Sequence, residues 1–331
     1  MPSGSTDSSP AVRASGQGGG LGRLGVLGRL GVLGRLSDPV LIAGRRYPAP
    51  GLILLAAIGA MLLLVVATTA WPVGSDEQAY WRAAQRLVAG QPLYDPAAVP
   101  NTPYAYWYPP VLAQVLAPLT PFISPTAFTG VWTVLLMACL WWLAGRNLLV
   151  MLALVAFVPV AVELRTRNVH LLLAVLIVLA LRRSWVFWVP AAALKIAPAL
   201  GAVYLLAAGR VREALGVGLL GAAVLAVSAL LAPDAWRDFI SVVGGRAGAE
   251  SGGLVAIPFL VRFGAGAALA AVAGRLGGRR GEVLLVVALT IANPTLWTTA
   301  LSLLVAIVPL LRDSPRDRIA APAAAPALAE A

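Results

Sequence analysis

Long apolar runs separated by short polar segments dominate the sequence between residues 52 and 311. The first run, LILLAAIGAMLLLVVATTA at 52–70, is long enough to cross a bilayer of about 30 Å as a helix that rises about 1.5 Å per residue. This pattern predicts an all-α integral membrane protein of about 8–10 transmembrane or half-membrane helices. The apolar segments fall near 52–70, 127–145, 147–163, 168–182, 185–208, 213–232, 254–273 and 282–311.

Two of these segments allow two interpretations. Residues 185–208 form either one span or two short helices that meet near Lys195, and residues 282–311 form either one long span or two short helices that meet at Asn293-Pro294. A proline disfavours helix at the residue before it, so Pro198 and Pro294 favour a break in each segment.

The distribution of arginines decides between the two interpretations. With both segments counted as hairpins that return to their starting side and with the N-terminus inside, 17 arginines fall in cytoplasmic segments and 6 in outer segments. A single crossing at 185–208 would move Arg210, Arg212, Arg275, Arg279 and Arg280 to the outside. We therefore expect two broken hairpins in a multi-pass protein of the cytoplasmic (plasma) membrane, with both termini inside.

Composition supports the membrane class and excludes several others. The chain is 60% hydrophobic and 12% charged, whereas soluble domains are nearer a quarter charged. Its net charge of +11 comes from arginines between apolar runs, which indicates cytoplasmic loops rather than a nucleic-acid surface. One cysteine and one histidine argue against a disulfide framework and a multi-histidine metal centre, so we expect no metal and no cofactor.

The chain is expected to divide into three parts. Residues 1–50 are rich in Ser and Gly, carry the repeat LGRLGV, and predict a disordered basic cytoplasmic tail in contact with membrane lipid. The apolar run that follows begins too late for a cleavable signal peptide, so we expect it to remain as the first span. Residues 51–311 form the membrane domain, with 71–126 as its first outer loop, and 312–331 form a second disordered cytoplasmic tail.

Lys195, the only lysine, lies in the apolar stretch VPAAALKIAPAL. It follows Arg183 by twelve residues, or about 18 Å of helix, which places it past the midplane toward the outer side. A lysine in such a position costs about 2.5–3.5 kcal/mol on insertion scales and indicates a functional site with an anionic partner. The alternative is a lysine that extends to the interface.

The first outer loop predicts a helix that lies on the membrane surface. It would begin at Ser75 or Asp76, end at Gly90, and bury an apolar face. That face consists of Tyr80, Trp81, Ala84, Leu87 and Val88.

Asp76 and Glu77 place carboxylates at the outer membrane surface just after the first span. A carboxylate in that place suits a general base that removes a proton from a hydroxyl, and the alternative is a helix cap. Aromatic residues up to Tyr108 follow in the same loop, and they suit either an interfacial belt or contacts to sugar or lipid.

Three further outer segments carry polar residues. VELRTRNVH at 162–170 offers Arg165, Arg167, Asn168 and His170 as donors to a phosphate or to sugar hydroxyls, unless it is an ordinary interfacial loop. The segment 232–253 predicts another surface-lying piece, and IANPTLWTTAL at 291–301 forms the apex of the second hairpin.

Taken in order, these motifs resemble the GT-C membrane glycosyltransferases, and specifically glycosyltransferase family 87. The family pattern of an Asp, an aromatic residue and G-x-x-L-Y in the first loop is matched by Asp76, Tyr80, Gly90, Leu93 and Tyr94. Tyr-Pro-Pro at 108–110, Lys-x-x-Pro at 195–198 and NPTLW at 293–297 fit as well, while Arg167 stands where members often have Gln. The resemblance covers roughly residues 50–311.

The resemblance implies a GT-C-like bundle that moves a sugar, mannose first and arabinofuranose second, from a polyprenyl-phosphate donor to a lipid or glycan acceptor. Asp76 would be the base, and Lys195 with Arg165 or Arg167 would neutralise the leaving phosphate. Two alternatives are a transporter or flippase of a lipid-linked or anionic substrate and a non-catalytic membrane subunit. The expected substrate contacts are Glu77, Tyr80, Tyr108, Asn168, His170, Asn293 and Trp297.

Overall fold

The computed structural model describes residues 40–42, 45–47, 57–62, 64, 72–94, 103–244 and 253–312. The chain divides into two units, residues 1–53 and 54–331. In the first unit β1 (Val40–Ile42) pairs antiparallel with β2 (Arg45–Tyr47), so a short hairpin lies within the segment expected to be a disordered tail. The remainder of that tail and the predicted tail beyond residue 312 lie outside the described residues.

Every regular element among the described residues of the second unit is a helix, which confirms the all-α class. The predicted first span at 52–70 is described only at 57–62 and 64, where it is helical. The α-helices are α3 (Ser75–Val88), α4 (Pro110–Leu116), α5 (Pro125–Leu143), α6 (Leu148–Val155), α7 (Val158–Thr166), α8 (His170–Arg182), α9 (Trp188–Leu194), α10 (Leu200–Ala207), α11 (Val211–Leu231), α12 (Pro233–Gly244), α13 (Phe259–Leu276), α14 (Gly278–Ile291) and α15 (Ile307–Arg312). In the part of the chain that the structure describes, four 3₁₀ segments join them: η2 (Ala117–Leu119), η3 (Trp185–Phe187), η4 (Ala197–Ala199) and η5 (Thr298–Ala306).

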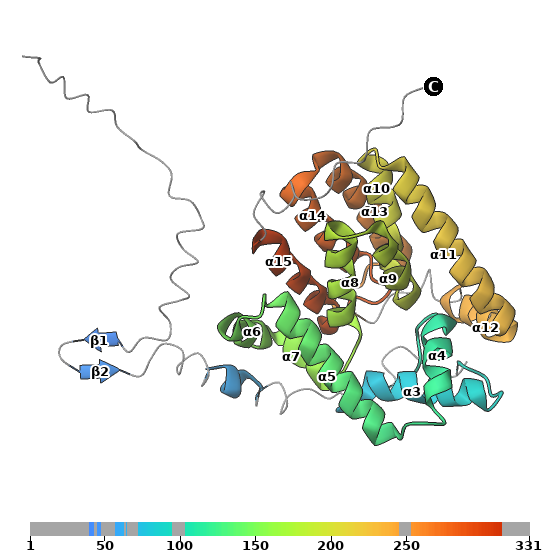
Figure 1. The fold of residues 1–331 in the computed structure, drawn as a ribbon, viewed down its shortest axis with the longest axis horizontal. Coiled ribbons are helices and arrows are strands. Elements are labelled where there is room, and N and C mark those ends of the chain that lie inside the picture. The colour runs from blue at the N-terminus through green and yellow to red at the C-terminus, as the bar shows by residue number, and fades with distance from the viewer. Residues whose placement is uncertain are drawn as a thin grey trace, which may run out of the picture. The chain divides into compact units, whose positions relative to one another are not determined.

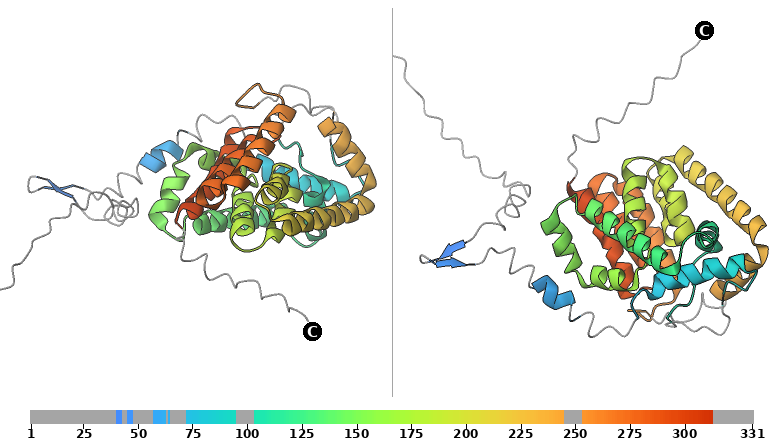
Figure 2. Two further views of the ribbon diagram at one scale, coloured as in Figure 1. Left: turned by 90° about the horizontal axis from the view of Figure 1, so that it is seen from above. Right: turned by 60° about the horizontal axis from the view of Figure 1, so that its bottom comes forward.

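Among the described residues, α5, α11 and α13 are long and apolar enough to cross a membrane, and α6 with α7 forms a fourth candidate. The other apolar helices are shorter, as expected for half-membrane elements. α8 runs through the middle of the bundle, where Leu171, Leu173 and Ile177 are fully buried. α11 follows the edge of the bundle in each view and leaves many apolar side chains exposed, as a lipid-facing helix does (Figures 1 and 2).

The predicted apolar segment at 147–163 forms two helices, α6 and α7, which meet at an angle of 84°. Phe157 between them is extended, and Pro159 is the second residue of α7. Proline has no N–H to donate to the preceding turn, and its ring disfavours a continuous helix at that point. The bend brings the end of α7 and the turn that follows it toward α3.

The first predicted hairpin is confirmed. α9 ends at Leu194, Lys195 is extended with φ −148° and ψ 147°, and the chain resumes as η4 and α10. The ring of Trp188 packs directly on Gly201. In a continuous helix these two residues would lie about 20 Å apart, so their contact requires the chain to reverse at Lys195.

Substitution at Gly201 tests this hairpin. A Cβ atom there would overlap the buried Trp188 ring, so we expect Gly201→Ala to destabilise the protein by about 1–3 kcal/mol. Gly218→Ala in α11 is the matched control, since a Cβ atom there meets nothing within 4 Å. Thermal unfolding in detergent should show a lower midpoint for the first variant alone, and equal midpoints would contradict the close packing.

The second hairpin is also confirmed, and a buried arginine holds its apex. α14 packs against both η5 and α15, so the chain reverses at Asn293-Pro294. Arg262 of α13 is 3% exposed and donates to the carbonyls of Ile291, Asn293 and Pro294, in addition to that of Ile257. A guanidinium group thus satisfies the backbone carbonyls that the break leaves free, which buried irregular backbone requires.

α3 forms where the first loop predicted a helix, but its start differs. Gly74, with φ +70°, precedes the helix and has no side chain to cap it, so neither Ser75 nor Asp76 is the N-cap. The helix ends before Gly90, whose φ is +65°. α3 buries the predicted apolar face, except that Val88 is exposed, against α4, α5 and α7. The second predicted surface piece forms α12.

Candidate active site

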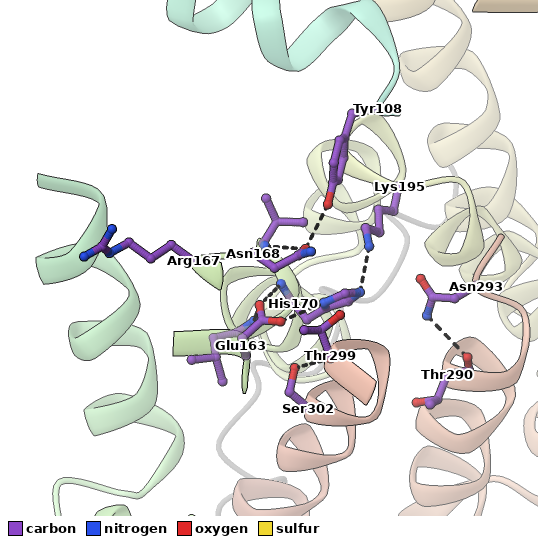
Figure 3. A network of polar contacts seen from close by, with 12 residues as sticks. Tyr108, Glu163, Arg167, Asn168, His170, Lys195, Thr290, Asn293, Thr299 and Ser302 are labelled. Carbon is purple, nitrogen blue, oxygen red and sulfur yellow. Dashed lines mark hydrogen bonds and ion pairs between the residues drawn. The ribbon is translucent and has the colours of Figure 1, made fainter. Parts of the chain in front are cut away.

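Lys195 lies at the turn of the first hairpin and points its ammonium group at a buried polar cluster (Figure 3). Its Nζ is 2.7 Å from Nε2 of His170 and 5.2 Å from the centre of the Tyr108 ring. A cation over an aromatic face is attracted by the ring quadrupole. The Lys195 ammonium therefore packs against side chains of the protein and does not point away from them.

A carboxylate missing from the sequence predictions supports His170. Glu163 is fully buried, and its Oε2 lies 2.9 Å from Nδ1 of His170. Its Oε1 accepts the backbone N–H groups of His170 at 2.6 Å and Leu171 at 3.4 Å, which start α8. The signal was a lone acidic residue among the apolar side chains of VPVAVELRT, and such a residue needs a buried partner.

Two tyrosines and an asparagine form a hydrogen-bonded chain beside Lys195. The Tyr80 hydroxyl donates to Tyr108 Oη at 2.9 Å, and the Tyr108 hydroxyl donates to Asn168 Oδ1 at 2.9 Å. The Tyr94 hydroxyl also donates to the Tyr108 carbonyl at 2.6 Å. These bonds join α3, the loop before α4 and the turn before α8, so three of the predicted substrate contacts line one site.

Asp76 lies on the first turn of α3 at the edge of this cluster. Burial raises the pKa of its carboxyl to about 6, and the charge of Glu163 acts in the same direction. Thr166, Asn168 and the Lys195 ammonium lower this pKa and oppose the shift. The fold therefore brings Asp76 and Lys195, far apart in the sequence, within electrostatic reach of each other.

Glu77 and Arg167 pair with each other. Arg167 Nη1 donates to Glu77 Oε1 at 3.0 Å, and the Thr129 hydroxyl donates to the same oxygen at 2.7 Å. Figure 3 shows the Arg167 side chain pointing away from Lys195. The Trp132 indole donates to the Arg167 carbonyl, and the Arg165 carbonyl accepts the Gly74 N–H at 2.9 Å, so this turn is fastened to both α3 and α5.

Asn293 and Trp297 lie at the apex of the second hairpin. Asn293 is fully buried, and its amide nitrogen donates to the carbonyls of Leu289 at 3.1 Å and Thr290 at 3.3 Å. Trp297 is half-buried just before η5. Figure 3 shows Asn293 bonded to Thr290, outside the hydrogen-bonded chain around His170.

The site combines the Asp76 carboxyl, whose pKa burial raises to about 6, with the oriented Lys195 ammonium. A carboxylate of that kind can accept a proton from a hydroxyl, and the ammonium can bind an anion. The described residues hold no group of three His, Cys, Asp or Glu side chains suited to a metal ion. The expectation that the protein uses no metal stays a prediction.

The comparison with protein families gives one match. The model of glycosyltransferase family 87 matches residues 106–329, about two thirds of the chain. The comparisons with curated proteins and with solved structures found no match. The matched residues include Tyr108, Glu163, Asn168, His170 and Lys195, while Asp76 precedes them and joins the site through the fold. On the extent of this match, the chain belongs to glycosyltransferase family 87.

Proposed function

We propose that this glycosyltransferase moves a sugar from a polyprenyl-phosphate donor to a hydroxyl of a lipid or glycan acceptor, with inversion at the anomeric carbon. The sugar is mannose in the first instance and arabinofuranose in the second. The reaction takes place at the outer face of the cytoplasmic membrane, with both termini of the chain inside. Family membership supports glycosyl transfer, and the helices long enough to span a membrane support a lipid-linked donor.

One observation carries the proposal: the Asp76 carboxyl and the Lys195 ammonium lie within electrostatic reach of each other. In a single displacement the acceptor oxygen forms a bond to the anomeric carbon, and the bond from that carbon to the phosphate oxygen breaks. Asp76 takes the hydroxyl proton, and the phosphate keeps the electron pair and gains a negative charge. Lys195 stabilises this charge, which develops fully only as the bond breaks.

The remaining predicted residues take supporting roles in this proposal. Tyr80, Tyr108 and Asn168 shape the wall between base and phosphate, and Asn293 and Trp297 line the acceptor side. Arg165 or Arg167 is the second cation proposed for the donor phosphate, and Arg167 also pairs with Glu77. Glu77 then serves the site by holding α3, and we propose no metal in the reaction.

Transfer by the purified wild-type protein tests the proposal. The protein in liposomes should move radiolabelled mannose or arabinofuranose from a β-linked polyprenyl-phosphate donor to a lipid acceptor, and NMR of the product should show the opposite anomeric configuration. Retention of configuration would exclude single displacement. Movement of the labelled donor between leaflets without any transfer would instead support the transporter alternative.

The pH profile gives an independent test of Asp76. Its carboxyl must be ionised to act as a base, and burial raises its pKa from 3.8 to about 6. We therefore expect kcat/KM to level off above that pH and to fall about tenfold per pH unit below it. A profile that stays flat down to the ordinary carboxyl range would contradict a base with this raised pKa.

A further inference from the structure

The sequence contains a single histidine, and the structure engages both of its ring nitrogens. Nδ1 of His170 faces Glu163 Oε2 at 2.9 Å, and Nε2 faces Lys195 Nζ at 2.7 Å. The other oxygen of Glu163 accepts two backbone N–H groups at the start of α8. Each group in this buried series therefore has its orientation fixed by the preceding one.

The donors and acceptors in this series determine the tautomer of His170. The two backbone N–H groups bonded to Glu163 and the nearby Lys195 ammonium favour its ionised form. An ionised carboxylate only accepts hydrogen bonds, so Nδ1 then carries the ring proton that faces Glu163. Nε2 is then unprotonated and accepts a hydrogen bond from the Lys195 ammonium. Among the described residues His170 is the one acceptor of a Lys195 hydrogen bond, which leaves two of the three ammonium N–H groups for a ligand.

We propose that Glu163 and His170 are positioning residues that aim the Lys195 ammonium at the phosphate of the donor. This inference rests on the proposed function for the identity of that phosphate. It also changes the expected role of His170, which holds the lysine and does not contact the sugar.

Positioning is needed because of the lysine side chain. Its four-carbon stem has many rotamers, and an ammonium that stabilises a developing charge has to be in place before the charge appears. The His170 nitrogen on one side and the Tyr108 ring on another restrict the ammonium to one position. Capping of α8 requires only Oε1 of Glu163, so the contact of Oε2 with the ring serves a second purpose.

Nitrogen NMR of protein labelled with [¹⁵N]histidine tests the arrangement without any substrate. Because the chain has one histidine, the two ring signals after tag removal belong to His170. We expect the Nδ1–H tautomer with an unprotonated Nε2 at neutral to mildly alkaline pH. A wild-type ring protonated at Nε2 would overturn the proposal, and this measurement requires no variant to fold.

Glu163→Gln gives the sharper comparison. The glutamine oxygen can still accept the backbone N–H groups of α8, so its amide N–H faces the ring and needs Nδ1 as an acceptor. The proton then moves to Nε2, and two donors face each other at Lys195. We expect the tautomer to switch, and an unchanged tautomer in the folded variant would overturn the proposal.

Kinetics separate positioning from general support of the fold. Misplacing a catalytic group by about 1 Å costs up to about 10²-fold, so Glu163→Gln should lower kcat/KM for the donor by between roughly tenfold and a hundredfold. Binding of polyprenyl monophosphate should weaken by a similar factor, while KM for the acceptor stays within about twofold. Normal donor kinetics in the variant would overturn the proposal.

Glu282→Gln provides the matched control. Glu282 pairs with Arg182 at 3.1 Å near the start of α14, so the change has the same chemistry at another buried ion pair. Its donor kinetics should stay near the wild-type values. If the wild-type protein neither transfers sugar nor binds polyprenyl phosphate, the proposed function fails. The tautomer of His170 would still show whether Glu163 orients the His170 ring toward Lys195.

Discussion

Asp76→Asn is expected to reduce transfer by about 10²–10⁴-fold, the range that a positioned general base contributes. The asparagine keeps the size of the side chain and removes only its ability to accept the proton. Burial raises the pKa of the Asp76 carboxyl, which means that its ionised form is disfavoured in the fold. Replacing it with a neutral amide should therefore be tolerated. Initial rates of transfer from a radiolabelled donor in liposomes measure the effect.

Asp234→Asn is the control for this substitution. Asp234 makes an ion pair with Arg237 on the exposed side of α12, and its side chain is 85% exposed, so its loss should leave transfer unchanged. The residual activity of Asp76→Asn should also lose the fall in rate near pH 6. Transfer at the wild-type rate by Asp76→Asn would remove Asp76 from the proposed mechanism.

Lys195→Met should lower kcat/KM for the donor by about 10²-fold, as removal of one preorganised donor to a developing oxyanion does. Methionine keeps most of the volume of the apolar stem but cannot stabilise the phosphate that leaves. Because a lysine at membrane depth costs about 2.5–3.5 kcal/mol on insertion scales, the variant should express at least as well as the wild type. Donor titration at saturating acceptor measures the loss.

Arg212→Met on α11 is the control, since it also exchanges a cation for methionine but at an exposed position. If Lys195→Met has the same donor kinetics as the wild type at equal protein levels, the ammonium contributes only to the structure. Loss of expression in Lys195→Met but not in Arg212→Met would also contradict the prediction, because the lysine would then be needed for folding.

The two hairpins could be predicted because they follow from local rules. Prolines at 198 and 294 restrict the preceding residues, and the arginine distribution requires each segment to return to its starting side. The bend between α6 and α7 could not be predicted, because the apolar run continues through it without a change in pattern. Pro159 was the local sign, but a proline alone does not distinguish a kink from a reversal.

The meeting of Asp76 with Lys195 could be anticipated from topology, but the partners of each could not. The sequence places Glu163 in a turn, whereas it lies in the last turns of α7, and its buried carboxylate contacts His170, seven residues later. The pairing of Arg167 with Glu77 depends on how α3 packs against the end of α7, which no local pattern specifies. Long-range packing therefore decides which arginine pairs with Glu77.

The adjacent acidic residues Asp76 and Glu77 at the start of α3 have different roles: Asp76 is the proposed base, and Glu77 binds neighbouring side chains. Side chains one position apart on a helix point about 100° away from each other, so Glu77 cannot share the direction of Asp76. By binding Arg167 and Thr129, Glu77 fixes the angle to which the whole helix is rotated about its axis. A slight rotation of α3 about its axis would change the direction of the Asp76 carboxyl relative to Thr166 and Asn168, so Glu77 helps to orient the proposed base.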